Sequence, residues 1–252
     1  MPAASRGAII VGASSGIGAA LARELAGRGY TLALLARRED ALTALSASLR
    51  GSALPVARAY AHDVTDYAAV PGLIERIATE MGSVPLRAVI YCAGIMPLGQ
   101  GDVWPFDEQR AMIETNTIGA MAWLDAGATA LRARGGGTLV GLSSVAGDRG
   151  RKGNSAYQAS KAALSVYLES LRYRLAGTNV RVVTIKPGFV ATPMTATVKT
   201  PKPLTSLPEP IARRIAASLD GGAEVVYAPG YWRGIMGIVR ALPGAVMKRT
   251  TF

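Results

Sequence analysis

A glycine-rich turn near the start of the chain limits most strongly what this sequence can fold into. The segment from Val11 to Gly18 reads VGASSGIG, follows an apolar run and precedes an amphipathic stretch. Glycine lacks a Cβ, so the chain can turn sharply there and a phosphate can approach the backbone N–H groups. A helix behind the turn adds free N–H donors and the positive end of its dipole. A strand, a glycine turn and the start of a helix together predict a nucleotide-phosphate cradle. The spacing of its glycines, G-x-x-x-G-x-G, differs from the common dinucleotide-binding pattern G-x-G-x-x-G. The alternative at this point is an ordinary turn in a glycine-rich protein.

Short apolar runs alternate with helix-length amphipathic segments along the chain. The runs are apolar on both faces, which is typical of a parallel sheet covered by helices on both sides. The expected strands are residues 8–11, 32–35, 56–59, 88–91, 138–142, 180–185 and 224–227. The expected helices are residues 17–28, 41–50, 67–81, 106–134 and 156–175. The alternation predicts a single α/β domain, a doubly wound Rossmann fold with a seven-stranded parallel sheet and helices on both faces.

This domain is expected to span residues 1–230, with a proline-rich substrate loop at 189–210 and a basic amphipathic extension at 231–252. The net charge of +11 is compatible with nucleic acid, anionic lipid or an arginine-rich proteome. No zinc-finger spacing or basic low-complexity arm is present, so nucleic acid is excluded as a partner. One cysteine and one histidine argue against a disulfide framework and against a metal site. Without an apolar leader or a spanning run, the chain is expected to be cytoplasmic.

Four polar residues have a spacing that suits proton transfer to a carbonyl oxygen. Tyr157 and Lys161 are four apart in an expected helix, so their side chains share one face. A neighbouring ammonium favours phenolate and lowers the tyrosine pKa from about 10. Ser144 follows a strand and can donate a hydrogen bond to the same oxygen, and Asn116 lies in the preceding helix. Singly, each residue has an ordinary alternative, such as a solvated helix face or a helix cap. Their common order predicts an acid–base site.

This ordered set resembles the short-chain dehydrogenase/reductase family over about residues 7–230. The matching features are the glycine turn, Asn116, the pattern Ser144-x12-Tyr157-x3-Lys161, and Pro187-Gly188 followed by Thr192. The resemblance implies that hydride moves between a nicotinamide and the substrate carbon. It implies that Lys161 also holds the nicotinamide ribose and that Asn116 supports a water chain from Lys161 to solvent. It further implies a homodimer or homotetramer that pairs through the helix after residue 155.

The expected cofactor is NADP(H). The second strand is followed by Ala36, Arg37 and Arg38, without the acidic residue that would bind the adenosine ribose and repel a 2′-phosphate. Guanidinium groups suit a phosphate by charge and by shape. In the alternative, both arginines only solvate the start of the next helix. The expected cofactor contacts are Gly12, Ser14, Ser15, Gly16, Ile17, Gly18, Arg37, Arg38, Asp63, Val64, Ala93, Gly94, Tyr157, Lys161, Pro187, Gly188, Val190 and Thr192.

Three positions depart from the family pattern. Where the family has Asn-Asn-Ala-Gly, residues 91–94 read Tyr-Cys-Ala-Gly, so the hydrogen bonds of both asparagines are unassigned. We expect Cys92 to be a small buried residue and not a nucleophile. Ser15 stands where many NADP-preferring relatives have a basic residue. Asp63 and Val64 keep the family's adenine contact.

The C-terminal extension is apolar on one side and basic on the other, and no acidic residue follows Glu224. Its apolar residues at helical spacing are Trp232, Ile235, Met236, Val239, Leu242 and Val246. This pattern suits a helix in a membrane interface, and it suits equally a helix that packs on the substrate cleft or on a second subunit. The segment resembles the tails of short-chain reductases that act on polyprenyl-phosphate-linked keto-sugars, which implies a lipid-linked substrate and peripheral contact with the inner face of the membrane.

We therefore expect an NADP(H)-dependent oxidoreductase that interconverts a ketone and a secondary alcohol, with Tyr157 as general acid/base. Its substrate is a small-molecule or lipid-linked carbonyl or alcohol. The substrate pocket is expected to be lined by residues 95–97, 146–151 and 189–207. The alternatives are an NADPH-binding sensor, a membrane-surface scaffold without turnover, and epimerisation or dehydration on the same scaffold.

Overall fold

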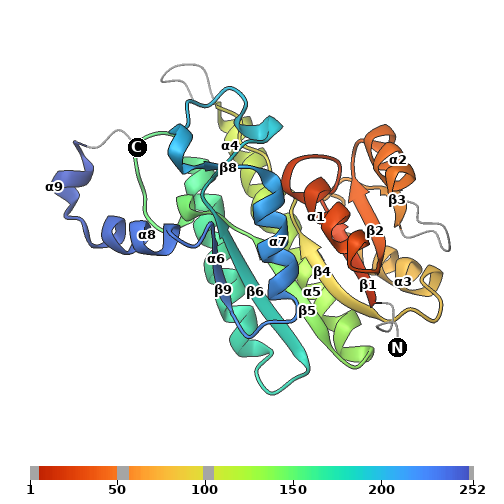
Figure 1. The fold of residues 1–252 in the computed structure, drawn as a ribbon. Coiled ribbons are helices and arrows are strands. Elements are labelled where there is room, and N and C mark those ends of the chain that lie inside the picture. The colour runs from red at the N-terminus through yellow and green to blue at the C-terminus, as the bar shows by residue number, and fades with distance from the viewer. Residues whose placement is uncertain (1–5, 50–56, 99–104, 250–252) are drawn as a thin grey trace.

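The computed structural model describes residues 6–49, 57–98 and 105–249. In these residues, seven parallel strands form one sheet in the order β3-β2-β1-β4-β5-β6-β9 (Figure 1). The strands are β1 (Arg6–Val11), β2 (Tyr30–Ala36), β3 (Ala57–Ala61), β4 (Leu86–Tyr91), β5 (Gly137–Leu142), β6 (Val180–Pro187) and β9 (Val225–Ala228). The strand order reverses between β1 and β4, where a doubly wound sheet forms its ligand crevice. The predicted fold is confirmed.

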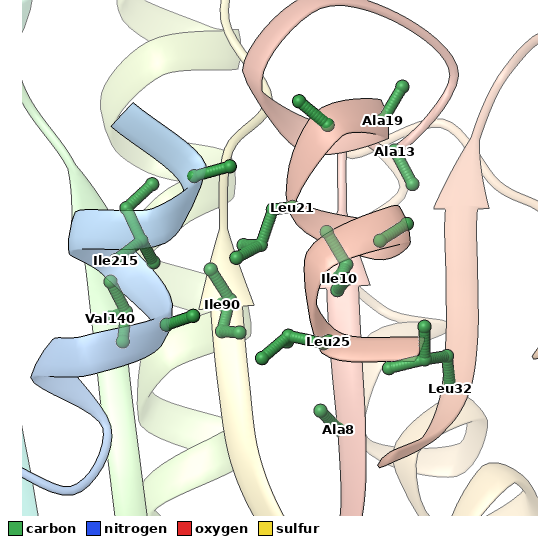
Figure 2. Close-up of a cluster of buried hydrophobic side chains, with 14 of the residues drawn as sticks. Ala8, Ile10, Ala13, Ala19, Leu21, Leu25, Leu32, Ile90, Val140 and Ile215 are labelled. Carbon is green, nitrogen blue, oxygen red and sulfur yellow. The ribbon is translucent and has the colours of Figure 1, made fainter. Parts of the chain in front are cut away.

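Helices cover both faces of this sheet (Figure 1). On one face lie α1 (Gly16–Gly27), α2 (Glu39–Ser48) and α7 (Pro208–Ser218). On the other lie α3 (Val70–Glu80), α5 (Gly119–Ala133) and α6 (Ser155–Arg174). Figure 2 shows side chains of α1 and α7, among them Leu21 and Ile215, resting on Ile10 and Ile90 of the strands.

The two hydrophobic layers follow from strand geometry. Successive residues of a strand point to opposite faces, so Ile10 joins the layer under α1 and α7 while Ile9 and Val11 join the layer under α3, α5 and α6. All three side chains are fully buried. Full burial of one such side chain is worth about 1.5–3 kcal/mol, which explains why strands that are apolar on both faces occupy the centre of the sheet.

One expected helix is divided in the structure, and one further helix, α7, was not expected. The helix expected at 106–134 is divided into α4 (Phe106–Ile113), a π-helical turn η1 (Glu114–Ile118) and α5. The helix α7 was not predicted, because the proline content of the preceding segment suggested loop up to residue 210. Its signals were a proline in the first turn and apolar residues at helical spacing, Ile211 and Ile215. Residue 50, the end of the expected helix 41–50, and residue 56, the start of the expected strand 56–59, lie outside the described residues.

The substrate loop contains short elements that tie it to the domain. These are β7 (Phe189–Val190), β8 (Thr205–Ser206) and the 3-10 turns η3 (Pro193–Thr195) and η4 (Lys202–Leu204). The strands β7 and β8 pair in parallel and form a second, two-stranded sheet. Both ends of the expected loop are therefore fixed to each other beside the carboxyl ends of the main strands.

The C-terminal extension forms α8 (Trp232–Ala241) and α9 (Gly244–Met247), which extend past the β9 edge (Figure 1). Its apolar stripe is used within the chain: Trp232, Met236 and Val239 are buried in a cluster with Val145. Ile238 on the other side of α8 is 68% exposed. Among the described residues, no helix combines the length and hydropathy that a bilayer crossing requires.

Candidate active site

A cleft of about 340 Å³ lies at the carboxyl ends of β1, β2, β4, β5 and β6. Its lining includes Ser144 and all of the expected cofactor contacts, from Gly12 to Thr192. Residues that the sequence did not single out also line it. They include His62, Thr115, Leu142 and Ser143. Each lies within two residues of an expected residue, so closeness in sequence at a strand or turn end was the available signal.

The glycine turn at the mouth of α1 is shaped to leave space for a phosphate. Gly12 has φ of 89°, and a Cβ there would lie 2.5 Å from the backbone nitrogen of Ala93. A Cβ on Gly18 would lie 2.2 Å from the carbonyl oxygen of Gly12. Ser15 is the N-cap residue of α1, and its side chain makes no capping hydrogen bond. The first turn of that helix contains no acidic residue. The N–H groups and the dipole of α1 are therefore not neutralised by the protein's own side chains, and they fit a phosphate group.

Two guanidinium groups line the cleft directly after β2. Arg38 donates from Nη2 to Oγ of Ser14 at 3.0 Å, which brings it to the glycine turn. Arg37 lies 3.9 Å from the carboxylate of Asp63, and its side chain is mostly exposed. Hydrogen bonds from Thr65, first from its backbone N–H, hold the pKa of Asp63 below its usual value. This end of the cleft is therefore lined by two cations with a single ionised carboxylate close to Arg37.

Ser144 and Tyr157 approach each other from two elements. Ser144 caps the 3-10 turn η2 (Val145–Gly147), where its Oγ accepts from the N–H of Ala146 at 3.0 Å. Asn154 caps α6 and accepts from the N–H of Tyr157 at 2.9 Å, which sets the first turn of that helix. Burial raises the pKa of Tyr157, and a hydrogen bond with Ser144 opposes that rise. The phenol therefore stays protonated at neutral pH.

Lys161 is buried below the same cleft. Its Nζ donates to the carbonyl oxygen of Leu142 at 2.9 Å and lies 5.9 Å from the ring centroid of Tyr157. Burial lowers the pKa of Lys161 to about 8. The expectation that the lysine lowers the pKa of Tyr157 is wrong for this structure, because loss of hydration dominates the titration of both groups.

Among the expected catalytic and cofactor-binding residues, all of which lie in the described part of the chain, Asn116 alone does not line the cleft. It is fully buried directly behind the cleft wall. Its Nδ2 donates to the carbonyl of Ile95 and to Oγ of Ser160, both at 3.0 Å, and its Oδ1 accepts from the N–H of Ile95 at 2.8 Å. A Cβ on Gly94 would lie 3.2 Å from Asn116 Oδ1 and 3.4 Å from Lys161 Nζ. The absence of a Cβ at Gly94 thus leaves room for the side chains of Asn116 and Lys161 directly behind this part of the cleft wall.

The C-terminal helix α8 contacts Gly188 in the cleft lining and the loop that follows Ser144. Arg149, in the loop after Ser144, donates from Nη1 to the carbonyl of Arg240 at 3.0 Å and from Nη2 to that of Leu242 at 3.1 Å. Trp232 lies so close to Gly188 that a Cβ there would be 1.8 Å from the indole nitrogen. Of the alternatives for the extension, the structure shows packing on the chain's own domain, beside the cleft.

Several known proteins are similar to this chain in sequence and in fold. The family model for short chain dehydrogenases matches residues 6–203. An uncharacterised oxidoreductase of Myxococcus xanthus is 41% identical over 198 residues, 79% of this chain and 77% of that protein. Another, from Mycobacterium tuberculosis, is 34% identical over 241 residues, 96% of this chain and 95% of that protein. A solved alcohol dehydrogenase of the archaeon Thermococcus sibiricus, complexed with 5-hydroxy-NADP, is 26% identical with a TM-score of 0.77, over 88% of this chain and 95% of that one.

Proposed function

The chain belongs to the short chain dehydrogenase family of oxidoreductases, and on this premise we propose that it interconverts a ketone and a secondary alcohol with NADP(H) as cofactor. One observation carries the proposal. Ser144, Tyr157 and Lys161 line the same cleft as the glycine turn, which lies far from them in the sequence. A protein that only senses a nucleotide has no need of an acid–base group beside a phosphate cradle.

The residues of the chain divide the chemistry as follows. A bound nicotinamide supplies or accepts the hydride. The phenol of Tyr157 gives its proton to the carbonyl oxygen during reduction and receives it back during oxidation. The hydroxyl of Ser144 donates a hydrogen bond to the same oxygen as negative charge develops. Lys161 and Asn116 both lie close to Gly94, and the family resemblance assigns them the proton path from the phenol to solvent.

The proposal is tested first with Tyr157→Phe, which removes only the phenolic oxygen. With NADPH and a panel of ketones, we expect turnover to fall by about 10²-fold or more, since general acid catalysis is worth that much. Binding of NADPH, followed by its fluorescence, should be within about twofold of wild type. Full activity of the variant would refute the assignment of Tyr157.

The preference for NADP(H) over NAD(H) rests on Arg37, Arg38 and Ser14. Support comes from the two guanidinium groups after β2 and from the relative that was solved with 5-hydroxy-NADP. Arg38→Ala should raise the KM for NADPH about tenfold, the loss of one charge-assisted contact, and leave the KM for NADH within about twofold. Arg132→Ala, at an exposed arginine of α5, is the matched control. Equal changes for both nucleotides would contradict a 2′-phosphate contact.

The lipid-linked substrate, membrane contact through 231–252 and self-association stay predictions. Support for membrane contact is limited to what α8 leaves exposed, namely Ile238 and the basic residues Arg233 and Arg240. The buried face of α8, including Trp232, is occupied by the chain's own cleft walls. Contact with a bilayer would therefore involve the outer side of the helix.

A further inference from the structure

The strand β4 ends at Tyr91, a residue that departs from the family pattern and lies outside the cleft lining. Its side chain is fully buried. Its phenol donates a hydrogen bond to the carbonyl oxygen of Thr115 at 2.5 Å. Thr115 belongs to the π-helical turn η1 and directly precedes Asn116. A tyrosine from the central sheet thus binds the backbone of the turn that presents Asn116.

The contact depends on a missing side chain. A Cβ on Gly119 would lie 2.7 Å from the hydroxyl oxygen of Tyr91 and 2.9 Å from the carbonyl oxygen of Val64. Both distances are too short for any side chain without movement of the backbone or of the phenol. Gly119 therefore opens the space through which the Tyr91 hydroxyl reaches the turn.

The extension of β4 holds the same turn a second time. Ile95, four residues after Tyr91, binds the side-chain amide of Asn116 through both its N–H and its carbonyl. Thr115 is thus held by Tyr91 and Asn116 by Ile95, so two consecutive residues of the turn are fixed to one strand and its extension. A change from i→i+4 to i→i+5 bonding takes a carbonyl away from its regular donor, and a buried carbonyl needs another one. Tyr91 provides a donor to the carbonyl of Thr115.

We propose that Tyr91 is a positioning residue for Asn116. Its phenol fixes the carbonyl of Thr115 and so holds the π-helical turn in the register that directs the Asn116 amide to Ile95 and Ser160, next to Lys161. Without that bond, the turn can revert to regular α-helical register, which rotates Asn116 away from Lys161. The kinetic consequence rests on the proposed function, since it concerns proton delivery to Tyr157.

Tyr91→Phe removes the hydroxyl and keeps the ring. The matched control is Tyr60→Phe, because Tyr60 is also buried on the α3 side of the sheet and its hydroxyl binds Glu80, away from the cleft. The first readout needs no turnover. Hydrogen–deuterium exchange of the Ile95 amide, which is bonded to Asn116 Oδ1, should accelerate about tenfold in Tyr91→Phe and not in Tyr60→Phe.

The second readout is kinetic. We expect kcat of Tyr91→Phe to fall about tenfold, the KM for NADPH to stay within about twofold, and the solvent deuterium isotope effect on kcat to increase. A purely structural loss would not raise the isotope effect. Gly119→Ala, which crowds the same hydroxyl, should give the same pattern if Tyr91→Phe does not fold.

Unchanged exchange at Ile95 together with unchanged kcat would overturn the positioning role, and so would equal effects in Tyr60→Phe. If the wild-type chain reduces no carbonyl compound, the proposed function fails, while the exchange comparison still decides whether Tyr91 holds the turn.

Discussion

The buried ammonium of Lys161 makes the stability of this protein depend on pH in a way that one substitution can isolate. Lys161 is 4% exposed, and its Nζ has one hydrogen bond, to the carbonyl of Leu142. Burial lowers its pKa from 10.5 to about 8. Lys161→Met keeps the length of the side chain and removes the charge.

The magnitude follows from linkage between protonation and folding. The pKa falls by about 2.5, and each whole pKa step corresponds to about 1.4 kcal/mol, so a charged Lys161 costs the native state about 3 kcal/mol. The unfolded chain holds this proton up to about pH 10.5 and the native chain only up to about pH 8. The cost is therefore complete below pH 8 and disappears as the pH rises toward 10.5. Between about pH 7.5 and 9.5, the free energy of unfolding of wild type should therefore increase by about 2 kcal/mol relative to that of Lys161→Met.

Urea unfolding of both proteins without nucleotide, at several pH values in this range, measures the difference directly. The variant also loses the hydrogen bond to Leu142. This loss shifts its unfolding free energy by a nearly constant amount at every pH and changes the pH dependence less. Lys152→Met is the control, because the exposed Lys152 keeps its hydration in the native state. A constant difference between wild type and Lys161→Met across the range would show that the ammonium is not desolvated, and the reasoning would be refuted.

Two further outcomes are expected. Arg149→Ala removes two hydrogen bonds to the carbonyl end of α8, so the free energy of unfolding in urea should fall by about 1 kcal/mol. The KM for the ketone should rise, while the KM for NADPH should not. An unchanged KM for the ketone would show that α8 does not support the substrate site. Ile238→Glu places a charge on the exposed side of α8 and should reduce co-sedimentation with anionic vesicles; equal sedimentation of both proteins would contradict membrane contact through this helix.

Much of the fold could be predicted because its signals are local. Strands that are apolar on both faces, such as the one containing Ile9 and Ile10, indicate a covered parallel sheet before any partner is known. The glycine turn was predictable for the same reason, since Gly12 must be glycine to pass Ala93. The four-residue spacing of Tyr157 and Lys161 places them on one helix face wherever the helix packs.

Other features depend on surfaces that come from distant parts of the chain. The break at Glu114–Ile118 is contacted by donors from β4 and its extension, Tyr91 and Ile95, and the sequence of the expected helix contains no proline that would predict it. The apolar stripe of α8 has the same period whether it meets lipid or protein. Only the fold brings Val145 and Phe189 together beneath Trp232 and so selects packing on the cleft.

The pKa values of the site show the same dependence on tertiary structure, and they bear on the chemistry. Spacing alone predicts an ion pair in which Lys161 favours the phenolate of Tyr157. Burial instead favours the neutral form of each group, because it raises the pKa of the tyrosine and lowers that of the lysine. A phenol that keeps its proton is a proton donor, so this arrangement favours reduction of a carbonyl near neutral pH. Oxidation of an alcohol needs the phenolate, and its rate should therefore increase as the pH rises.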